Sequence, residues 1–274
     1  MSRAATADSY VRRLQRVTAH IHAHLDEPMD LEQLAAIACL SPFHFHRTYR
    51  SMIGETVIET VTRLRLHRAA NALAQTPTAI ARIAAQAGYA SVQAFSRAFR
   101  AAYGKSPAVF RADRRHTPGP ITMTVNIQDR PTLRIACIKH IGPPQQIGRA
   151  FDRVMAWAGP MGVAMPPALG VAVYLSDMKT VPPEEQEALA GLTVGPQIMA
   201  DEIVEIYEAP AGRYAVLLYK GPYALIGKGY EQLFAWLPSS GEEPAHRPMM
   251  EINLNDPRQT APEDLLTELC LPLR

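Results

Sequence analysis

Apolar side chains recur at every third or fourth position through most of the first 115 residues. One such series consists of Leu14, Val17, Ile21 and Leu25, and it predicts a helix over residues 10–25. A longer series predicts a second helix over residues 57–75. Shorter helical segments lie between and after these two, and Gly or Pro residues separate them. The pattern predicts an all-α first domain.

Residues 83–107 have the pattern of a helix, a tight turn and a second helix. Gly88 stands at the turn, because only glycine enters the left-handed conformation that ends a helix without steric cost. Ser91 is a good N-cap for the second helix, in which Phe95 and Phe99 form an apolar stripe. The pattern predicts a helix-turn-helix unit over about residues 79–104.

The second helix of this unit has a polar face that suits the major groove of DNA. The face carries Gln93, Arg97 and Arg100. Glutamine can pair with adenine, and arginine can bind guanine with two hydrogen bonds. We therefore expect Gln93 and Arg97 to contact bases, and Arg100 to contact a phosphate.

The same pattern occurs once earlier, over residues 34–54, if one residue is inserted at Ala90. The residues that align with Ser91, Arg97 and Arg100 are then Ser41, Arg47 and Arg50. Cys39 takes the place of Gly88, so the conformation of the first turn stays open. Two such units, at about residues 30–54 and 79–104 with one long helix between them, are a much more specific signal than one.

This double pattern resembles the DNA-binding domain of AraC/XylS-type transcription regulators over about residues 10–115. The resemblance implies double-stranded DNA as a partner, with the second helix of each unit in the major groove, and RNA polymerase as a further partner. Transferred by position, it implies contacts with base edges or thymine methyl groups for Phe43, His46 and Arg47. Arg50 would contact a phosphate. Plain solvent exposure of these side chains is the alternative.

Three arginines on the connecting helix allow two interpretations. Arg63, Arg65 and Arg68 form either a solvated face or a set of phosphate contacts. His20 and His24, one turn apart near the end of the first helix, could bind a metal, but no third ligand follows at a suitable spacing. We interpret them as solvated histidines, and we predict no metal and no cofactor.

The second half of the chain has a different pattern, with short alternating segments typical of strands. It contains an internal repeat, because residues 123–194 align with residues 202–273 without gaps at a constant offset of 79. Each copy is predicted to form two strands, a helix at about residues 145–157 or 225–237, and two more strands. Duplicated halves predict one pseudo-symmetric α+β domain with a groove at the seam.

Residues 211–241 and 248–257, and more weakly 134–148, resemble the GyrI-like effector-binding domain. This resemblance covers about residues 121–274 and implies that the second domain binds a small-molecule effector. It also places a functional glutamate in the strand that contains Glu251. The predicted domains are then 1–115 for DNA binding and 121–274 for the effector, with a linker at 116–120 that is rich in Pro and Gly.

Glu251 lies between Met250 and Ile252 on a strand predicted to be half buried. A carboxylate near a pocket needs a cation or hydrogen-bond donors, or it takes up a proton. The aromatic residues that the repeat brings to the same groove are Trp157, Trp236, Tyr174 and Tyr219. An acid beside aromatic rings favours a lipophilic cation as the ligand. The alternatives are a solvent-facing acid, and tryptophans that only pack the helices on the sheet.

Charge is distributed unevenly between the two halves. Residues 1–116 contain 16 Lys and Arg against 8 Asp and Glu, whereas residues 117–274 contain 12 against 18. A basic half joined to an acidic half is typical of a polyanion-binding domain fused to another function. Three cysteines without a CxxC motif, and the lack of an apolar run near 18 residues, favour a cytoplasmic protein without a membrane span.

Three functions remain in competition after these observations. The first is a transcription regulator that reads DNA and senses an effector. The second is an enzyme, because some stand-alone GyrI-like proteins are described as hydrolases with a glutamate and an aromatic hydroxyl at the site; Glu251 would then act as a general base. The third is a DNA-binding protein whose second half docks a protein partner. We predict the regulator, with no catalytic residues.

Overall fold

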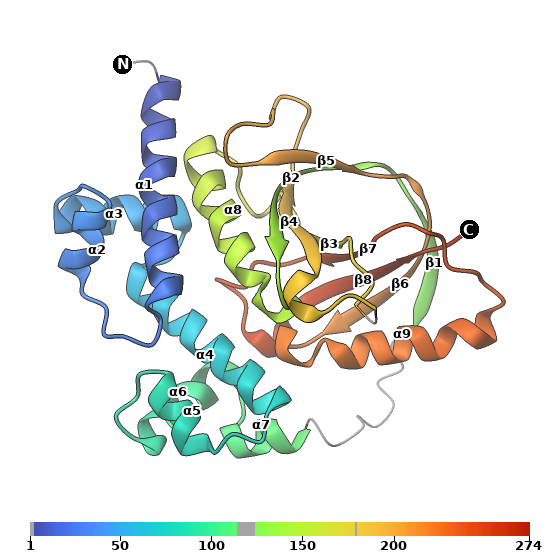
Figure 1. Cartoon of the computed structure of the whole chain (residues 1–274), viewed down its shortest axis with the longest axis horizontal. Helices are drawn as coiled ribbons and strands as arrows, with labels where there is room; N and C mark the ends of the chain where they lie inside the picture. Colours follow the sequence, from blue (N-terminus) through green and yellow to red (C-terminus); the bar gives the residue numbers. More distant parts are fainter. Residues whose placement is uncertain (1–2, 114–123, 179) are drawn as a thin grey trace. The chain divides into compact units, whose positions relative to one another are not determined.

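The computed structural model describes residues 3–113, 124–178 and 180–274, which form two compact units (Figure 1). The first unit is helical and the second is built on an antiparallel sheet with helices. This division confirms the two predicted fold types. The predicted linker at 116–120 lies outside the described residues, so the domain boundaries stay predictions.

The helical unit contains two helix-turn-helix units joined by one long helix. Its elements are α1 (Arg3–Ala23), α2 (Leu31–Ile37), α3 (Pro42–Ile53), α4 (Val57–Gln75), α5 (Ile80–Gln86), α6 (Val92–Tyr103) and α7 (Pro107–Asp113). The predicted connecting helix over residues 57–75 is confirmed at both ends. It begins with a capping box, in which Thr56 and Glu59 each bind the backbone N–H of the other.

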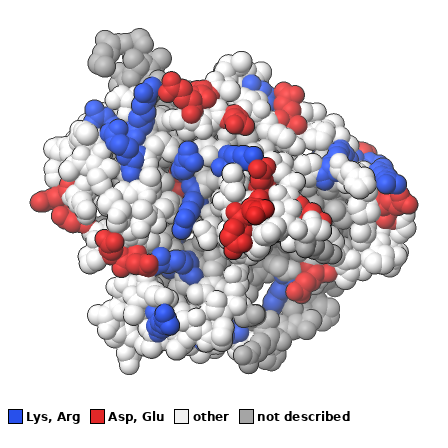
Figure 2. All heavy atoms as spheres, viewed as in Figure 1, with Lys and Arg blue, Asp and Glu red and all other residues white. Residues whose placement is uncertain are grey.

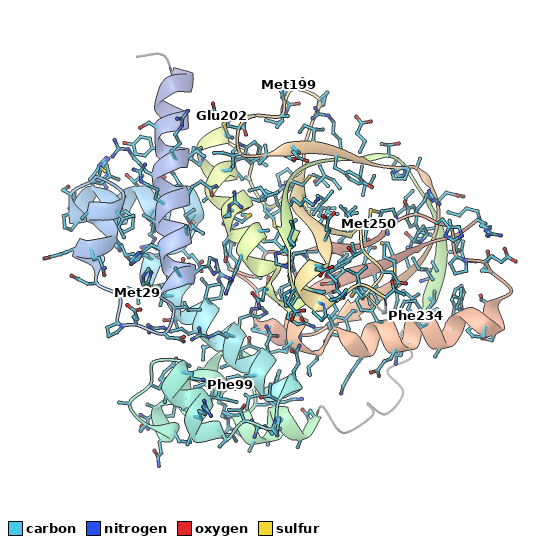
Figure 3. All side chains as sticks on the ribbon, viewed as in Figure 1. Met29, Phe99, Met199, Glu202, Phe234 and Met250 are labelled. Atoms are coloured by element: carbon cyan, nitrogen blue, oxygen red, sulfur yellow. The ribbon has the colours of Figure 1, made fainter. Side chains whose placement is uncertain are left out.

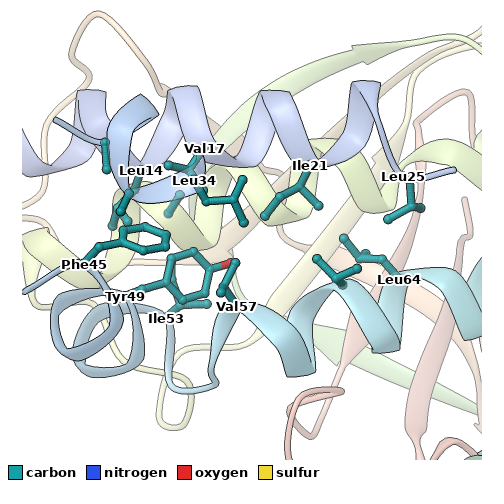
Figure 4. Close-up of a cluster of buried hydrophobic side chains, with 14 residues drawn as sticks. Leu14, Val17, Ile21, Leu25, Leu34, Phe45, Tyr49, Ile53, Val57 and Leu64 are labelled. Atoms are coloured by element: carbon teal, nitrogen blue, oxygen red, sulfur yellow. The ribbon is translucent and has the colours of Figure 1, made fainter. Parts of the chain in front are cut away.

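Each helix-turn-helix unit has its own core. In the first, Phe45 and Tyr49 of α3 pack against α1, α2 and the start of α4 (Figure 4). In the second, the rings of Phe99 and Phe110 lie edge to face at 5.3 Å, and Tyr103 stacks on Phe99 at 4.5 Å. These apolar stripes lie on the inner faces of α3 and α6, so their polar faces point outward.

The two turns adopt the same backbone conformation although their residues differ. Gly88 has φ +79° and Cys39 has φ +53°, both in the left-handed region. Cys39 is the one described residue other than glycine with a positive φ. The first turn is thus built like the second, at the steric cost that an L-residue has in this region.

The second unit contains one strongly curled sheet of eight antiparallel strands (Figure 1). The strands are β1 (Val125–Arg130), β2 (Leu133–Ile141), β3 (Gly170–Tyr174), β4 (Glu187–Thr193), β5 (Glu205–Ala209), β6 (Gly212–Lys220), β7 (Met249–Asn253) and β8 (Leu266–Pro272). Their order across the sheet is β1-β6-β8-β7-β3-β4-β2-β5. One strand of each predicted repeat, β3 and β7, lies at the centre, where Ala172 is opposite Glu251.

The second half of the chain contains two α-helices among its described residues, α8 (Gly148–Met161) and α9 (Gly227–Ser240). Both begin later than predicted, because the chain first makes 3-10 turns over Pro144–Gln146 and Tyr223–Leu225. Both helices also end later than predicted, at Met161 and Ser240. Each contains a proline near its C-terminal end, and the helix continues past this proline. The helix boundaries were therefore the weaker part of the prediction.

The two faces of the sheet bury different cores. One face carries Val171, Val173, Met250, Ile252 and Cys270, and it forms the larger apolar cluster. The opposite face packs against α9 through Leu217 and Leu233, and against the start of α8 through Phe151. Because side chains alternate along a strand, Glu251 belongs to the face that the helices cover. The strand thus carries its acid into a buried layer.

The turn before α6 supplies a stability test. Gly88→Ala would force an L-residue into the left-handed region, and its Cβ would lie 2.8 Å from the Arg65 guanidinium. We expect the free energy of unfolding to fall by about 1–2 kcal/mol in a urea titration. Cys39→Gly should raise the free energy of unfolding, because glycine adopts the left-handed conformation without steric cost. The rise should be smaller than the loss at Gly88, because glycine loses more chain entropy on folding. Equal effects at the two turns would contradict this view.

Candidate DNA-binding surface and effector site

The helices α3 and α6 present the same arrangement of buried and exposed side chains. In α6, Phe95 and Phe99 are fully buried, and the side chain of Ser91 accepts a hydrogen bond from the N–H of Ala94 at 3.1 Å. The residues predicted to contact DNA, Gln93, Arg97 and Arg100, are all exposed. Within the described part of the chain, neither arginine has an ion-pair partner, so both guanidinium groups are available to a ligand.

On α3 the predicted residues lie on the corresponding face. Phe43, Arg47 and Arg50 are exposed and His46 is half buried. The Arg47 guanidinium lies over the ring of Phe43, 5.6 Å from its centroid. A cation held against an aromatic face is partly ordered before any ligand arrives. Phe43 has 73% of its surface exposed, which is unusual for a phenylalanine without a partner.

His44 was not predicted as part of this surface, but it lies at the start of α3 beside Phe43. Its Nε2 is 3.1 Å from the hydroxyl of Tyr10 on α1 and 3.5 Å from the hydroxyl of Thr48. The sequence offered no signal for this contact, because Tyr10 and His44 are distant along the chain. The contact ties the start of α3 to α1.

The three arginines of α4 fit neither of the two interpretations based on the sequence. Arg63 forms an ion pair with Glu55 at 2.7 Å. Arg65 donates to the carbonyl oxygens of Leu25 and Glu27, and Arg68 donates to that of Gln86. The donors of all three side chains bind groups of the same unit, so these arginines are neither fully solvated nor free for phosphate contacts.

The surface of the helical unit is not uniformly basic. Figure 2 shows Lys and Arg side chains mixed with Asp and Glu side chains on the face in view. The basic balance of this half is therefore divided between arginines that bind backbone carbonyls, such as Arg13 and Arg65, and arginines that point outward, such as Arg97. The net charge of this half therefore overstates how much positive charge is available to a polyanion.

Glu251 on β7 is 8% exposed, so it is not the solvent-facing acid that one alternative described. Its Oε1 accepts a hydrogen bond from the hydroxyl of Tyr230 on α9 at 2.7 Å, and the hydroxyl of Tyr174 on β3 also bonds to the carboxylate. Burial raises the pKa of the Glu251 carboxyl, and these two hydroxyl groups oppose the rise. Among the described residues no cation pairs with it.

The other predicted ligand residues lie in different surroundings. Tyr219 donates its hydroxyl to the carbonyl of Pro222 at 3.0 Å, and it packs under α9. Trp236 is partly buried in the same cluster, and Trp157 on α8 is fully buried. The structure therefore brings Glu251 and Tyr174 together. Ligand contacts by Tyr219 and the two tryptophans stay predictions.

Two aromatic residues of α9 complete the surroundings of Glu251 and were missed by the sequence analysis. The rings of Tyr230 and Phe234 stack with centroids 6.3 Å apart and planes at 23°. Phe234, labelled in Figure 3, is 44% exposed, whereas Tyr230 reaches the buried carboxylate. The repeat held a signal, since Tyr230 aligns with Phe151, which packs beside Tyr174. The exposed ring of Phe234 thus stacks on the tyrosine whose hydroxyl binds Glu251.

The part of the chain that the structure describes holds no group of three or more His, Cys, Asp or Glu residues suited to a metal ion. The rings of His20 and His24 stack at 4.1 Å, and both residues are half buried, so they are partly solvated. No helix among the described residues is long and apolar enough to cross a membrane.

Comparison with known families divides the chain in the same way. Residues 123–274 match the model of a GyrI-like small molecule binding domain, which covers more than half of the chain. Residues 34–113 match the model of a helix-turn-helix domain.

Curated relatives align with part of the chain. The regulatory protein SoxS of Escherichia coli (strain K12) is 31% identical over 103 residues, which are 38% of this chain and 96% of SoxS. The bifunctional transcriptional activator/DNA repair enzyme AdaA of Bacillus subtilis (strain 168) is 38% identical over 95 residues, which are 35% of this chain and 45% of AdaA. The chain therefore spans less than half of the length of AdaA.

Solved structures also match each unit separately. The DNA-binding domain of AdpA, in complex with a target DNA, is 33% identical with a TM-score of 0.36, and the match covers 37% of this chain and 92% of that chain. The EcmrR C-terminal domain is 16% identical with a TM-score of 0.44, and the match covers 56% of this chain and 99% of that chain.

The burial of Glu251 predicts a pH dependence of stability. Because its pKa is raised on folding, its contribution to stability is fully present below the pKa of the unfolded chain and is lost as pH rises through the folded pKa. Glu251→Gln cannot ionise. We expect the difference between the urea midpoint of the variant and that of wild type to become more positive as the pH is raised from about 4 to about 8.

The matched control is Glu231→Gln, which changes an exposed glutamate of α9. Its midpoint should follow that of wild type at every pH. A Glu251→Gln difference that stays constant with pH would show that the carboxylate is no harder to ionise in the folded protein.

Proposed function

The chain belongs to the GyrI-like family through residues 123–274, and we propose that it is an AraC-type transcription regulator. In this proposal α3 and α6 read one asymmetric DNA site, and Glu251 binds a cationic effector. The observation that carries the first half is the equivalent outward face of the two helices, with Arg47 and Arg97 at the same place in each. One chain already carries two reading helices, which supports binding as a monomer.

The two helices offer different chemistry to the bases. Gln93 and Arg97 of α6 suit adenine and guanine, because each can form two hydrogen bonds to the matching base edge. Arg47 of α3 suits guanine, and the exposed ring of Phe43 beside it suits a thymine methyl group. His46 lies beside this pair on the same face of α3. Arg50 and Arg100, nearer the helix ends, would contact phosphates and fix the register.

The buried carboxylate supports a lipophilic cation as the effector. An unpaired acid among Tyr174, Tyr230 and Phe234 gains a counter-ion when a cation binds, and the rings attract the cation as well. Desolvation makes this pairing stronger than it would be at the surface. Neutral ligands gain the aromatic contacts only, so the site discriminates by charge.

We also propose that the second unit is a pseudo-symmetric duplication. Its two halves contribute strands and a helix in the same order, and β3 pairs with β7 at the centre. His140 and Tyr219 occupy equivalent positions, and each binds the carbonyl of the proline in the following Gly-Pro turn at 3.0 Å. As a regulator, the protein would have RNA polymerase as a further partner, and residues 1–115 and 121–274 would be its two domains.

A hydrolytic activity is the second candidate. A glutamate hydrogen-bonded to a tyrosine hydroxyl, as in Glu251 and Tyr230, is the arrangement that a general base with a hydroxyl partner would need. We favour binding, because the Glu251 carboxylate already accepts hydrogen bonds from the hydroxyl groups of Tyr230 and Tyr174, and each of these bonds lowers its basicity. Turnover of a bound compound by the purified protein would reverse this preference.

Arg97 supplies the test of base reading. Arg97→Ala should weaken binding to a selected DNA site by about 1–3 kcal/mol and relax the preference at one base pair, in a competition assay against single-base variants of the site. Arg82→Ala, which removes an exposed arginine from α5, is the control for lost charge. If Arg97→Ala lowered the affinity for every sequence by the same factor, Arg97 would be a phosphate contact.

Ligand selectivity supplies the test of Glu251. We expect a lipophilic cation such as tetraphenylphosphonium to raise the melting temperature of the full-length protein more than a neutral molecule of similar size does. Glu251→Gln should remove most of the difference between the two, because only the cation uses the charge, whereas Glu231→Gln should retain it. Equal shifts in wild type and Glu251→Gln would exclude Glu251 from the site, and no shift with any compound would favour a protein-docking role.

A further inference from the structure

We propose that Arg65 and Arg68 hold the two helix-turn-helix units at one fixed separation, so that the spacing between two half-sites of DNA becomes part of recognition. This proposal rests on the proposed function, in which α3 and α6 both read bases. It assigns a positioning role to two side chains whose donors bind groups of the helical unit itself.

Arg65 contacts both helix-turn-helix units at once. Its Nε donates to the carbonyl of Leu25 at 2.9 Å, and a terminal nitrogen donates to the carbonyl of Glu27 at 2.6 Å. Both carbonyls lie in the segment between α1 and α2. On its other side the guanidinium lies against Gly88, where a Cβ would approach it to 2.8 Å. The guanidinium group of Arg65 thus lies between the first helix-turn-helix unit and the turn of the second, in contact with both.

Arg68, one turn further along α4, joins the same two segments. Its guanidinium donates to the carbonyl of Gln86 at 2.7 Å, at the end of α5. It also forms an ion pair with Asp26, between α1 and α2. A cation beside the last carbonyls of a helix is electrostatically favourable, because those carbonyls lack partners within the helix. Both arginines therefore bridge residues 25–27 and residues 86–88.

The bridged segments lie directly before the elements that they position. Residue 27 precedes the start of α2 at Leu31 by four positions, and Gly88 precedes the start of α6 at Val92 by four. Rotation of one unit against the other about α4 would break the bonds of both arginines together. Because a guanidinium is planar and donates in fixed directions, it resists such a rotation more than a flexible ammonium group does.

A rigid pair of reading helices cannot follow a change in the spacing of half-sites. One inserted base pair moves a half-site by about 3.4 Å and turns it by about 35° around the DNA axis. One helix then loses its base contacts, and a single lost readout already costs about tenfold in affinity. The wild-type protein should therefore tolerate no insertion, whereas a protein without the two bridges should lose less.

The experiment compares DNA duplexes selected from a random library by the full-length protein, with zero, one or two base pairs inserted between the half-sites. We expect wild type to lose about tenfold or more in affinity on a one-base-pair insertion. The double variant Arg65→Lys with Arg68→Lys keeps both positive charges but removes the planar guanidinium groups. Its loss of affinity on the same insertion should shrink to about threefold or less. Arg68→Lys alone, at the more exposed position, provides a second variant if the double variant does not fold.

The quantity that decides is the ratio of affinities between the two spacings. Arg82→Lys changes an exposed arginine of α5 and should keep the wild-type ratio. If the variants lose affinity equally at all spacings, the two arginines serve folding alone and the proposal is wrong. If selection yields no two-part site, or Arg47→Ala and Arg97→Ala leave the selected site bound as tightly, the proposed function fails, and the spacing proposal falls with it.

Discussion

Two left-handed turns, after α2 and after α5, are the constraint on which the helical unit depends. Each turn leaves carbonyl oxygens without partners inside the helix, and in both cases arginines from the preceding long helix bind them. Arg13 of α1 donates to the carbonyls of Ala38 and Cys39, each at 2.7 Å, and Arg68 of α4 donates to that of Gln86. The helices α3 and α6 begin shortly after these turns, so their directions follow from the same bonds.

The second unit depends on an opposite balance, because it buries an ionisable carboxyl group for which the described residues offer no counter-ion. Glu251 belongs to a central strand, and the alternation of that strand directs it to the face that the helices cover. The hydroxyl groups of Tyr230 and Tyr174 form hydrogen bonds with this carboxyl group, but neither tyrosine supplies a positive charge. A protein that needed only a stable sheet would place an apolar residue there, as Ala172 shows at the equivalent position in the other half.

Arginine plays two distinct roles in the first unit, and its position on a helix decides which. On α3 and α6 the side chains of Arg47 and Arg97 continue the polar face, away from the buried rings, and remain open to a polyanion. On α4 the side chains of Arg65 and Arg68 are only partly exposed, and their donors bind carbonyl oxygens instead. The same residue type is therefore exposed on α3 and α6, whereas on α4 it binds groups of its own unit.

Local patterns in the sequence were sufficient for much of this structure. Helical periodicity, the N-caps at Ser41 and Ser91, and the outward faces of α3 and α6 depend on residues close together along the chain, and Glu251 stood out because an acid interrupted an apolar strand. Only the tertiary structure decided what depends on distant pairs. In the folded protein the hydroxyl of Tyr230 binds Glu251, and Arg65 binds the carbonyls of Leu25 and Glu27. Cys39 adopts the left-handed conformation that glycine usually occupies. The sequence could not show these contacts, because hydrogen bonds between remote segments leave no periodic pattern in it.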